Sequence, residues 1–138
     1  MTAVTDGDPQ ILPILADEDV VRARQLVRTL AVSAKLSLVD QTKLVTAASE
    51  LARNTLVYGN GGHMEAATVR NERHAGVRLY FADEGPGIAD LDLAMTDGYT
   101  SGSGLGLGLS GTRRLVDEFD IDTAPGAGTR ITIIKWAR

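Results

Sequence analysis

Residues 77–109, VRLYFADEGPGIADLDLAMTDGYTSGSGLGLGL, change character twice, and these changes indicate how the chain folds. The apolar run Val77–Ala82 favours a buried strand, and the polar, glycine-rich stretch Asp83–Gly104 favours a long loop. Apolar residues then return at helical spacing over Leu105–Phe119, which predicts a helix that opens with glycines. Eight of the 15 glycines of the chain lie in this loop or at the start of this helix, so the backbone here must approach something closely.

The segments around this stretch predict two helices before it and further strands on both sides. Asp17 is the expected cap of a helix over Asp17–Lys35, and Ser37 with Asp40 is expected to begin a second helix, Leu38–Tyr58. The order β-α-α-β-β-α-β-β, with the strands in one sheet and the helices on one face, belongs to the α+β class. The other expected strands are Gln10–Leu15 (an edge strand, because it contains Pro13), Met64–Asn71, Ile121–Thr123 and Gly128–Trp136.

Length and composition agree with one globular domain. The chain has 138 residues, of which 43% are hydrophobic and 23% charged, so we expect a flexible N-terminus over residues 1–9 and a single domain over residues 10–138. The absence of cysteine excludes disulfides, cysteine metal sites and a thiol nucleophile. A net charge of −4 argues against a nucleic-acid partner. Because there is no run of 18 apolar residues and no signal-type start, we expect no membrane segment and a cytoplasmic protein.

Glu50 and Asn54 are the first candidate site residues. They stand four residues apart in the second expected helix, so both project from one face, beside its apolar stripe. A carboxylate in that position can act as a general base, and an amide oxygen one turn away can bind Mg²⁺. Taken alone, the pair is more typical of a solvated glutamate and a local hydrogen bond, because helices contain many such pairs.

Asp83, directly after the expected strand, is the second candidate. Its carboxylate can accept a hydrogen bond from the amino group of a base, and Gly85 and Gly87 let a flat ring approach the backbone. Near the last strand, the Thr129 hydroxyl can bond close to such a base. Tight turns explain both glycine patterns as well, so each is weak evidence alone.

The run Gly102–Leu109, GSGLGLGL, is the third candidate. Glycines before a helix expose backbone N–H groups and the positive end of the helix dipole, which suits phosphate. A dinucleotide-binding reading fails because no strand precedes the run, and no P-loop motif occurs. Since no Lys or Arg lies between Arg78 and Arg113, a phosphate here would depend on backbone N–H groups and a metal ion. A flexible loop that packs leucines is the alternative.

In combination these motifs resemble a known family over residues 10–136. Glu50-x-x-x-Asn54, Asp83-x-Gly85-x-Gly87, Gly104-x-Gly106-x-Gly108 and Gly128-Thr129 look like the N, G1, G2 and G3 boxes of the GHKL (Bergerat-fold) ATPases. The resemblance implies an α/β sandwich, with a mixed, mostly antiparallel sheet and helices on one face. Within that superfamily the chain is similar to the RsbT-like switch serine/threonine kinases of bacterial partner-switching systems.

The resemblance also implies roles for individual residues. Glu50 matches the catalytic general base, Asn54 the Mg²⁺ ligand and Asp83 the residue that binds the adenine amino group. Gly87 would lie beneath the ring, and Thr129 would support adenine binding. The implied ATP-binding residues are Asn54, Asp83, Gly85, Gly87, Ile88, Gly104, Leu105, Gly106, Leu107, Gly108, Leu109 and Thr129.

The implied activity is transfer of the ATP γ-phosphate to Ser or Thr of STAS-domain partners, with ATP and Mg²⁺ as cofactors. In RsbT-like kinases these partners are RsbS- and RsbR-like stressosome components, and the released kinase activates an RsbU-like PP2C-type phosphatase. One alternative is an anti-sigma factor, a nucleotide-dependent sequestering module. Such relatives use a lid arginine, and the expected lid, residues 89–103, has none.

Two further features bear on partners. A detached histidine-kinase catalytic domain is disfavoured because His63 and His74 lie near strand or turn ends, not on a dimerising helix. Arg22, Arg24 and Arg28 form a basic row on the first expected helix. This row is either a partner-binding face or an ordinary solvated face.

Overall fold

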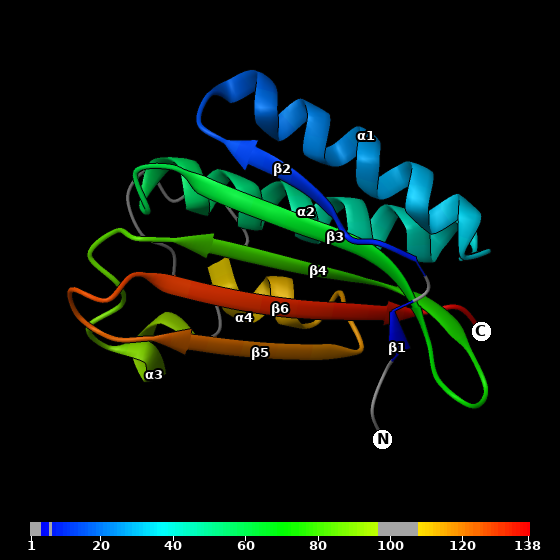
Figure 1. Ribbon diagram of the computed structural model, residues 1–138. Helices are drawn as coiled ribbons and strands as arrows, with labels where there is room; N and C mark the ends of the chain where they lie inside the picture. The colour runs from blue at the N-terminus through cyan, green and yellow to red at the C-terminus, as the bar shows by residue number, and fades with distance from the viewer. Residues whose placement is uncertain (1–3, 6, 97–107) are drawn as a thin grey trace.

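The computed structural model describes residues 4–5, 7–96 and 108–138 of the chain. Within them, one six-stranded sheet is covered on one face by helices (Figure 1). The strands are β1 (Val4–Thr5), β2 (Gln10–Ile14), β3 (Gly62–Arg70), β4 (Ala75–Asp83), β5 (Glu118–Thr123) and β6 (Thr129–Trp136). The helices are α1 (Asp17–Ser33), α2 (Leu38–Val57), α3 (Leu91–Ala94) and α4 (Gly108–Arg113).

The sheet has the order β1-β3-β4-β6-β5, and β2 pairs with the same edge of β3 as β1 does. Every pairing among the described strands is antiparallel, which confirms the expected α+β class and specifies the sheet further. The register places Met64 opposite Phe81, and Phe81 opposite Ile131. Because side chains alternate along a strand, these three residues face the helices together.

The core lies between this sheet face and the helices α1 and α2. Leu44 and Leu51 of α2 and Val27 of α1 are at most 1% exposed, as are Leu79 and Ile133 of the sheet. The apolar stripe that predicted α2 therefore faces the sheet. Burial of a leucine or isoleucine side chain contributes about 1.5–3 kcal/mol relative to exposure, so this layer holds α2 against the sheet.

The start of α1 differs from the sequence-based expectation. The N-cap is Ala16, not Asp17, and the carboxylate of Asp19 satisfies the free backbone groups instead. Its Oδ2 accepts hydrogen bonds from the N–H groups of Leu15 (2.9 Å) and Ala16 (3.1 Å). The Leu15 N–H donor is the main reason that the pKa of Asp19 lies below its ordinary value.

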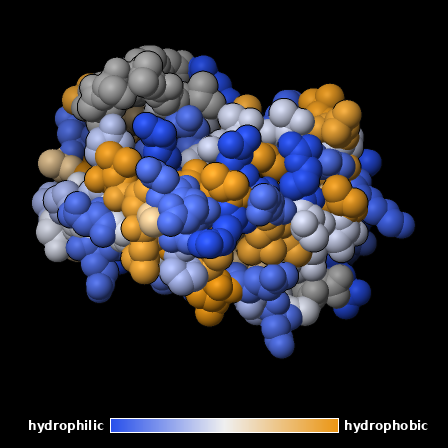
Figure 2. All heavy atoms as spheres, turned by 90° about the horizontal axis from the view of Figure 1, so that it is seen from above, coloured by the Kyte–Doolittle hydropathy of each residue, from blue (hydrophilic) through white to orange (hydrophobic). Residues whose placement is uncertain are grey.

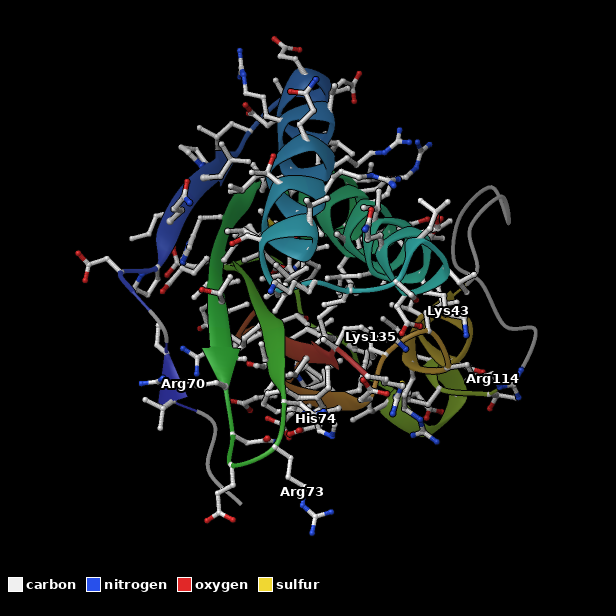
Figure 3. All side chains as sticks on the ribbon, turned by 90° about the vertical axis from the view of Figure 1, so that its right-hand side faces the viewer. Lys43, Arg70, Arg73, His74, Arg114 and Lys135 are labelled. Carbon is white, nitrogen blue, oxygen red and sulfur yellow. The ribbon has the colours of Figure 1, made fainter. Side chains whose placement is uncertain are left out.

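The start of α2 is as expected and is tied to the last strand. The Ser37 hydroxyl accepts from the Asp40 N–H at 3.1 Å, which confirms the predicted cap. Lys135 of β6, only 5% exposed, has its Nζ 3.6 Å from Asp40 Oδ1 and 3.7 Å from Asp117 Oδ1 (Figure 3). Two carboxylates thus offset the cost of burying this ammonium group.

Several expected boundaries are wrong. The helix expected over Leu105–Phe119 is described from Gly108 and ends at Arg113. Phe119 belongs instead to β5, which begins at Glu118. The short helix α3 lies within the expected loop, and β1 pairs with β3 where no strand was expected. The strands β3 and β4 are longer than expected, so Asp83 is the last residue of β4 instead of the residue after it.

The surface seen from above, over α1, mixes hydrophilic and hydrophobic residues (Figure 2). Arg22 of α1 donates to Asp19 Oδ1 at 2.7 Å, so part of the basic row is engaged within its own helix.

His74 lies at the turn between β3 and β4 (Figure 3) and His63 near the start of β3, so both lie near strand or turn ends, as expected. Among the described residues, no helix combines the length and the apolar character needed to cross a membrane.

Candidate functional site

A cavity of about 640 Å³ opens beside the C-terminal half of α2, where β4 ends and β6 begins. It brings together residues from all four sequence motifs. Predicted site residues in its wall are Glu50, Asn54, Asp83, Gly87, Ile88, Gly108, Leu109 and Thr129. The size suits a nucleotide-sized ligand.

Glu50 and Asn54 reach the cavity from α2. Both side chains are half-buried. They lie at the edge of the helix face that packs into the core, where Leu51 is fully buried. The helix continues one turn past Asn54, whose backbone carbonyl accepts from the N–H groups of Tyr58 (3.0 Å) and Gly59 (3.1 Å). The structure therefore places a carboxylate and an amide on one wall of the cavity, as the i, i+4 spacing predicts.

Asp83 enters the cavity from the end of β4, where it is paired with both Gly62 and Thr129. Its Oδ1 accepts a hydrogen bond of 2.9 Å from the Gly85 N–H. Gly85 itself is buried and is not among the residues that line the cavity. The role that the structure gives to Gly85 is to orient the Asp83 carboxylate.

Gly59 packs directly against Asp83. A Cβ atom on Gly59 would lie 2.3 Å from Asp83 Cγ and 2.5 Å from Asp83 Oδ2. A Cβ atom on Gly85 would in turn lie 2.7 Å from the Gly59 Cα. The end of α2 therefore meets the Asp83 turn backbone to backbone, an approach that only glycine allows.

We expect Gly59→Ala to weaken nucleotide binding at least about tenfold, or about 1.4 kcal/mol, because the new methyl group must displace the Asp83 carboxylate. Titration calorimetry with Mg-ADP measures this change. Gly7→Ala is the control, since a Cβ there meets nothing within 4 Å and the strain from its φ of +111° lies outside the cavity wall, so it should retain wild-type affinity. Equal affinities for both variants would show that Asp83 does not depend on Gly59.

The turn after Asp83 is fastened to the hairpin between β5 and β6. The Pro86 carbonyl accepts from the Gly126 N–H at 2.7 Å, and the Ile88 N–H donates to Thr123 Oγ1 at 3.0 Å. Gly87 has a φ of +73°, and a Cβ on it would lie 2.0 Å from the Ala124 carbonyl oxygen. The structure therefore gives Gly87 a reason to be glycine that differs from the expected approach of a flat ring, namely its contact with this hairpin.

The glycine-rich motif is described only in part. Gly108 and Leu109 begin α4 and line the cavity, whereas the predicted residues Gly104, Leu105, Gly106 and Leu107 lie outside the described residues. Thr112 Oγ1 donates to the Gly108 carbonyl at 2.9 Å and so secures the first turn of α4.

Several lining residues were not selected from the sequence as site residues, among them Tyr58, Leu93 and Arg53. Tyr58 and Leu93 add apolar wall, and Arg53 brings a cation that the expected lid lacks. Arg113 and Arg114, the other cations near the motifs, are not among the lining residues. From the sequence, each of these three arginines could contribute from a neighbouring turn, but the sequence does not place them.

The described residues contain no group of three or more His, Cys, Asp or Glu side chains arranged to hold a metal ion. The predicted residues instead give the cavity the carboxylates of Glu50 and Asp83, the Asn54 amide and the Thr129 hydroxyl as oxygen donors, and Asp90, Ser49, Thr55 and Tyr58 also line it. Hard cations such as Mg²⁺ often bind through one or two protein oxygens and complete their shell with phosphate oxygens and water. The donor set therefore fits a magnesium–nucleotide complex better than a free-standing metal site.

Comparisons with known proteins agree with this geometry. Residues 39–137 match the family described as histidine kinase-, DNA gyrase B-, and HSP90-like ATPase. The chain is 40% identical over 132 residues to serine/threonine-protein kinase RsbT of Bacillus subtilis (strain 168), covering 96% of this chain and 99% of the relative.

Some more distant relatives are anti-sigma factors. An anti-sigma F factor of Thermoanaerobacter sp. (strain X514) is 25% identical over 118 residues, 83% of this chain and 82% of the relative. The crystal structure of the RsbU and RsbW domains of Rv1364c from Mycobacterium tuberculosis superposes with a TM-score of 0.65 at 20% identity. That match covers 96% of this chain and 33% of the other, and it supports the fold.

Proposed function

Since the chain belongs to the histidine kinase-, DNA gyrase B-, and HSP90-like (GHKL) ATPase family, we propose that its cavity binds ATP and transfers the γ-phosphate to a protein serine or threonine. The family expected from the motifs is thereby confirmed, and the chain is a homologue of a serine/threonine-protein kinase. The observation that carries the proposal is the meeting of Glu50, Asn54 and Asp83 in one cavity.

Adenine recognition is assigned to the wall formed by Asp83, Gly87, Ile88 and Thr129. With Oδ1 bound by the Gly85 N–H, the other oxygen of Asp83 remains to accept from the amino group of the base. Gly87, packed against the β5–β6 hairpin, contributes to this wall, and the side chains of Ile88 and Leu93 supply apolar contact. These contacts hold the nucleotide in one orientation.

Phosphate binding is assigned to the glycine-rich segment that ends in Gly108 and Leu109, together with Asn54. Asn54 would hold Mg²⁺ through its amide oxygen, and bound Mg²⁺ neutralises charge on the phosphates. Arg53 adds a positive charge at the same wall. Positioning and charge neutralisation are the main demands of phosphoryl transfer, and this chain meets them with few charged side chains.

Glu50 is assigned the role of general base. Its carboxylate lies in the cavity wall one helical turn before Asn54, so a hydroxyl that enters beside the phosphates meets an acceptor. Glu50 takes the proton of the attacking Ser or Thr hydroxyl, the new O–P bond forms, and ADP leaves with the electron pair of the broken bond. Removal of this carboxylate therefore affects transfer more than nucleotide binding.

The proposed partners follow from the kinase homology. We propose that STAS-domain proteins, such as RsbS- and RsbR-like stressosome components, accept the phosphate, and that an RsbU-like PP2C-type phosphatase is activated afterwards. We also propose that residues 10–138 act as a single kinase domain in the cytoplasm. Similarity to a kinase named RsbT over 96% of the chain supports these partners.

The test is intact-mass analysis of a cognate STAS-domain protein after incubation with this protein and Mg-ATP. We expect a gain of one phosphoryl group, which disappears when the phosphorylated residue of the partner is replaced by alanine. Tight nucleotide binding with stable capture of a sigma factor and no transfer would instead support the anti-sigma alternative. The similarity to anti-sigma F factors makes that alternative the proper comparison.

A further inference from the structure

Thr123 of β5 is tied to the adenine-binding wall but is not itself among the residues that line the cavity. Its Oγ1 has three hydrogen-bond contacts: the Ile88 N–H at 3.0 Å, the Gly128 carbonyl at 3.0 Å and the Thr129 hydroxyl at 2.9 Å. These partners come from the turn after β4 and from the entry to β6. The hydroxyl thus joins the two segments that flank the base.

The chemistry of these three contacts determines which hydroxyl donates. A threonine hydroxyl has one proton to give and two lone pairs with which to accept. The Gly128 carbonyl can only accept, so it takes the Thr123 proton, and the Ile88 N–H can only donate. All three bonds are therefore satisfied together when Thr129 donates its proton to Thr123.

We propose that Thr123 is a positioning residue that determines base specificity. Because Thr123 accepts the proton of the Thr129 hydroxyl, Thr129 can face the nucleotide base only as a hydrogen-bond acceptor. The inference rests on the proposed function, because it assumes that a nucleotide base occupies the cavity beside Thr129. Asp83, whose strand position pairs with Thr129, is also an acceptor. The wall consequently presents acceptors at neighbouring positions.

A wall of acceptors selects a base by the group that the base presents. At position 6 an amino purine offers N–H donors, whereas an oxo purine offers a carbonyl oxygen there and an N–H only at the adjoining ring nitrogen, so its carbonyl oxygen would face acceptors. A site rejects a ligand strongly when binding of that ligand leaves buried polar groups of the site without hydrogen-bond partners. Thr123 thereby favours adenine over hypoxanthine or guanine without touching the base.

The experiment compares ADP and IDP binding by titration calorimetry, because the two nucleotides differ in the groups at position 6 and the adjoining ring nitrogen. Thr123→Val keeps the shape of the side chain but releases the Thr129 proton, so Thr129 can donate to a 6-oxo group. We expect the ratio of Kd for IDP to Kd for ADP to fall about tenfold in this variant. Thr123→Ser keeps the hydroxyl and should keep the wild-type ratio within about twofold.

Two controls separate specificity from structure. In a Thr129→Val background, Thr123→Val should no longer change the ratio, because its effect acts through Thr129. Thr132→Val, on the same strand but lining a separate pocket with Glu65 and Tyr80, should leave both affinities unchanged.

Three results would overturn the inference. If Thr123→Val weakens ADP and IDP by the same factor, Thr123 only anchors the turn at Ile88. If Thr123→Ser loses selectivity as Thr123→Val does, the hydroxyl is not the cause. If the wild-type protein binds neither nucleotide, the proposed function fails and the inference fails with it.

Discussion

Glu50→Gln is expected to slow phosphoryl transfer to a partner protein at least about 100-fold while leaving nucleotide affinity within about twofold. Glutamine keeps the size and the polar contacts of the side chain but cannot accept the proton of the attacking hydroxyl. Proton transfer by a positioned side chain typically contributes a factor of about 10² to 10⁴. Because the carboxylate acts on the acceptor hydroxyl, the loss should appear in the rate of transfer and not in binding of ATP.

Single-turnover phosphorylation of the partner, followed by intact mass, measures the rate, and calorimetry with Mg-ADP measures the affinity. Glu65→Gln is the matched control, because Glu65 lies on β3, outside the cavity wall, and pairs with His63 at 3.1 Å. That variant should transfer phosphate at the wild-type rate. Transfer by Glu50→Gln within threefold of wild type would remove Glu50 from the mechanism, even if kinase activity itself stands.

Asp83→Asn is expected to weaken Mg-ADP binding about 10- to 100-fold. The Gly85 N–H donates to one oxygen of Asp83, so the amide oxygen of asparagine takes that position. The amide NH₂ group then occupies the position of the other carboxylate oxygen. It faces the amino group of adenine, so two hydrogen-bond donors meet without an acceptor. Loss of a hydrogen bond to a charged group together with this mismatch accounts for about 1.5–3 kcal/mol.

The affinity of Asp83→Asn is measured by calorimetry, and thermal unfolding without nucleotide checks that the variant is folded. Asp122→Asn serves as the control, since its side chain is 75% exposed, contacts Arg130 of β6 and is not among the residues that line the cavity. This change should leave binding unaltered. An Asp83→Asn protein that binds ADP as the wild type does would place the base elsewhere in the cavity.

The helix α2 was predictable almost in full. The Ser37 cap and the stripe of Leu44, Ala48 and Leu51 are local patterns, and the structure confirms both. The i, i+4 spacing of Glu50 and Asn54 then places both side chains on the cavity wall, because helix geometry alone relates them.

The region after α4 was predicted poorly, for a physical reason. Leu115, Val116 and Phe119 fit a helical period, but Phe119 and Ile121 also alternate as in a half-buried strand. Pairing of Phe119 with Ile133 and of Ile121 with Ile131 decides in favour of the strand. These pairing partners lie 14 and 10 residues away, so a local pattern does not reveal them.

Patterns in the sequence were enough to predict the family, the order of the motifs and the types of residue that line the cavity. Spacing within one helix or one turn carries this information, because neighbouring residues are related by fixed backbone geometry. Only the tertiary structure decided that Gly59 packs on Asp83 and that Thr123 bonds to Ile88, 35 residues away. Such contacts depend on how β4, β5 and β6 pair and how α2 ends against them, since strand register brings distant polar groups within hydrogen-bond distance.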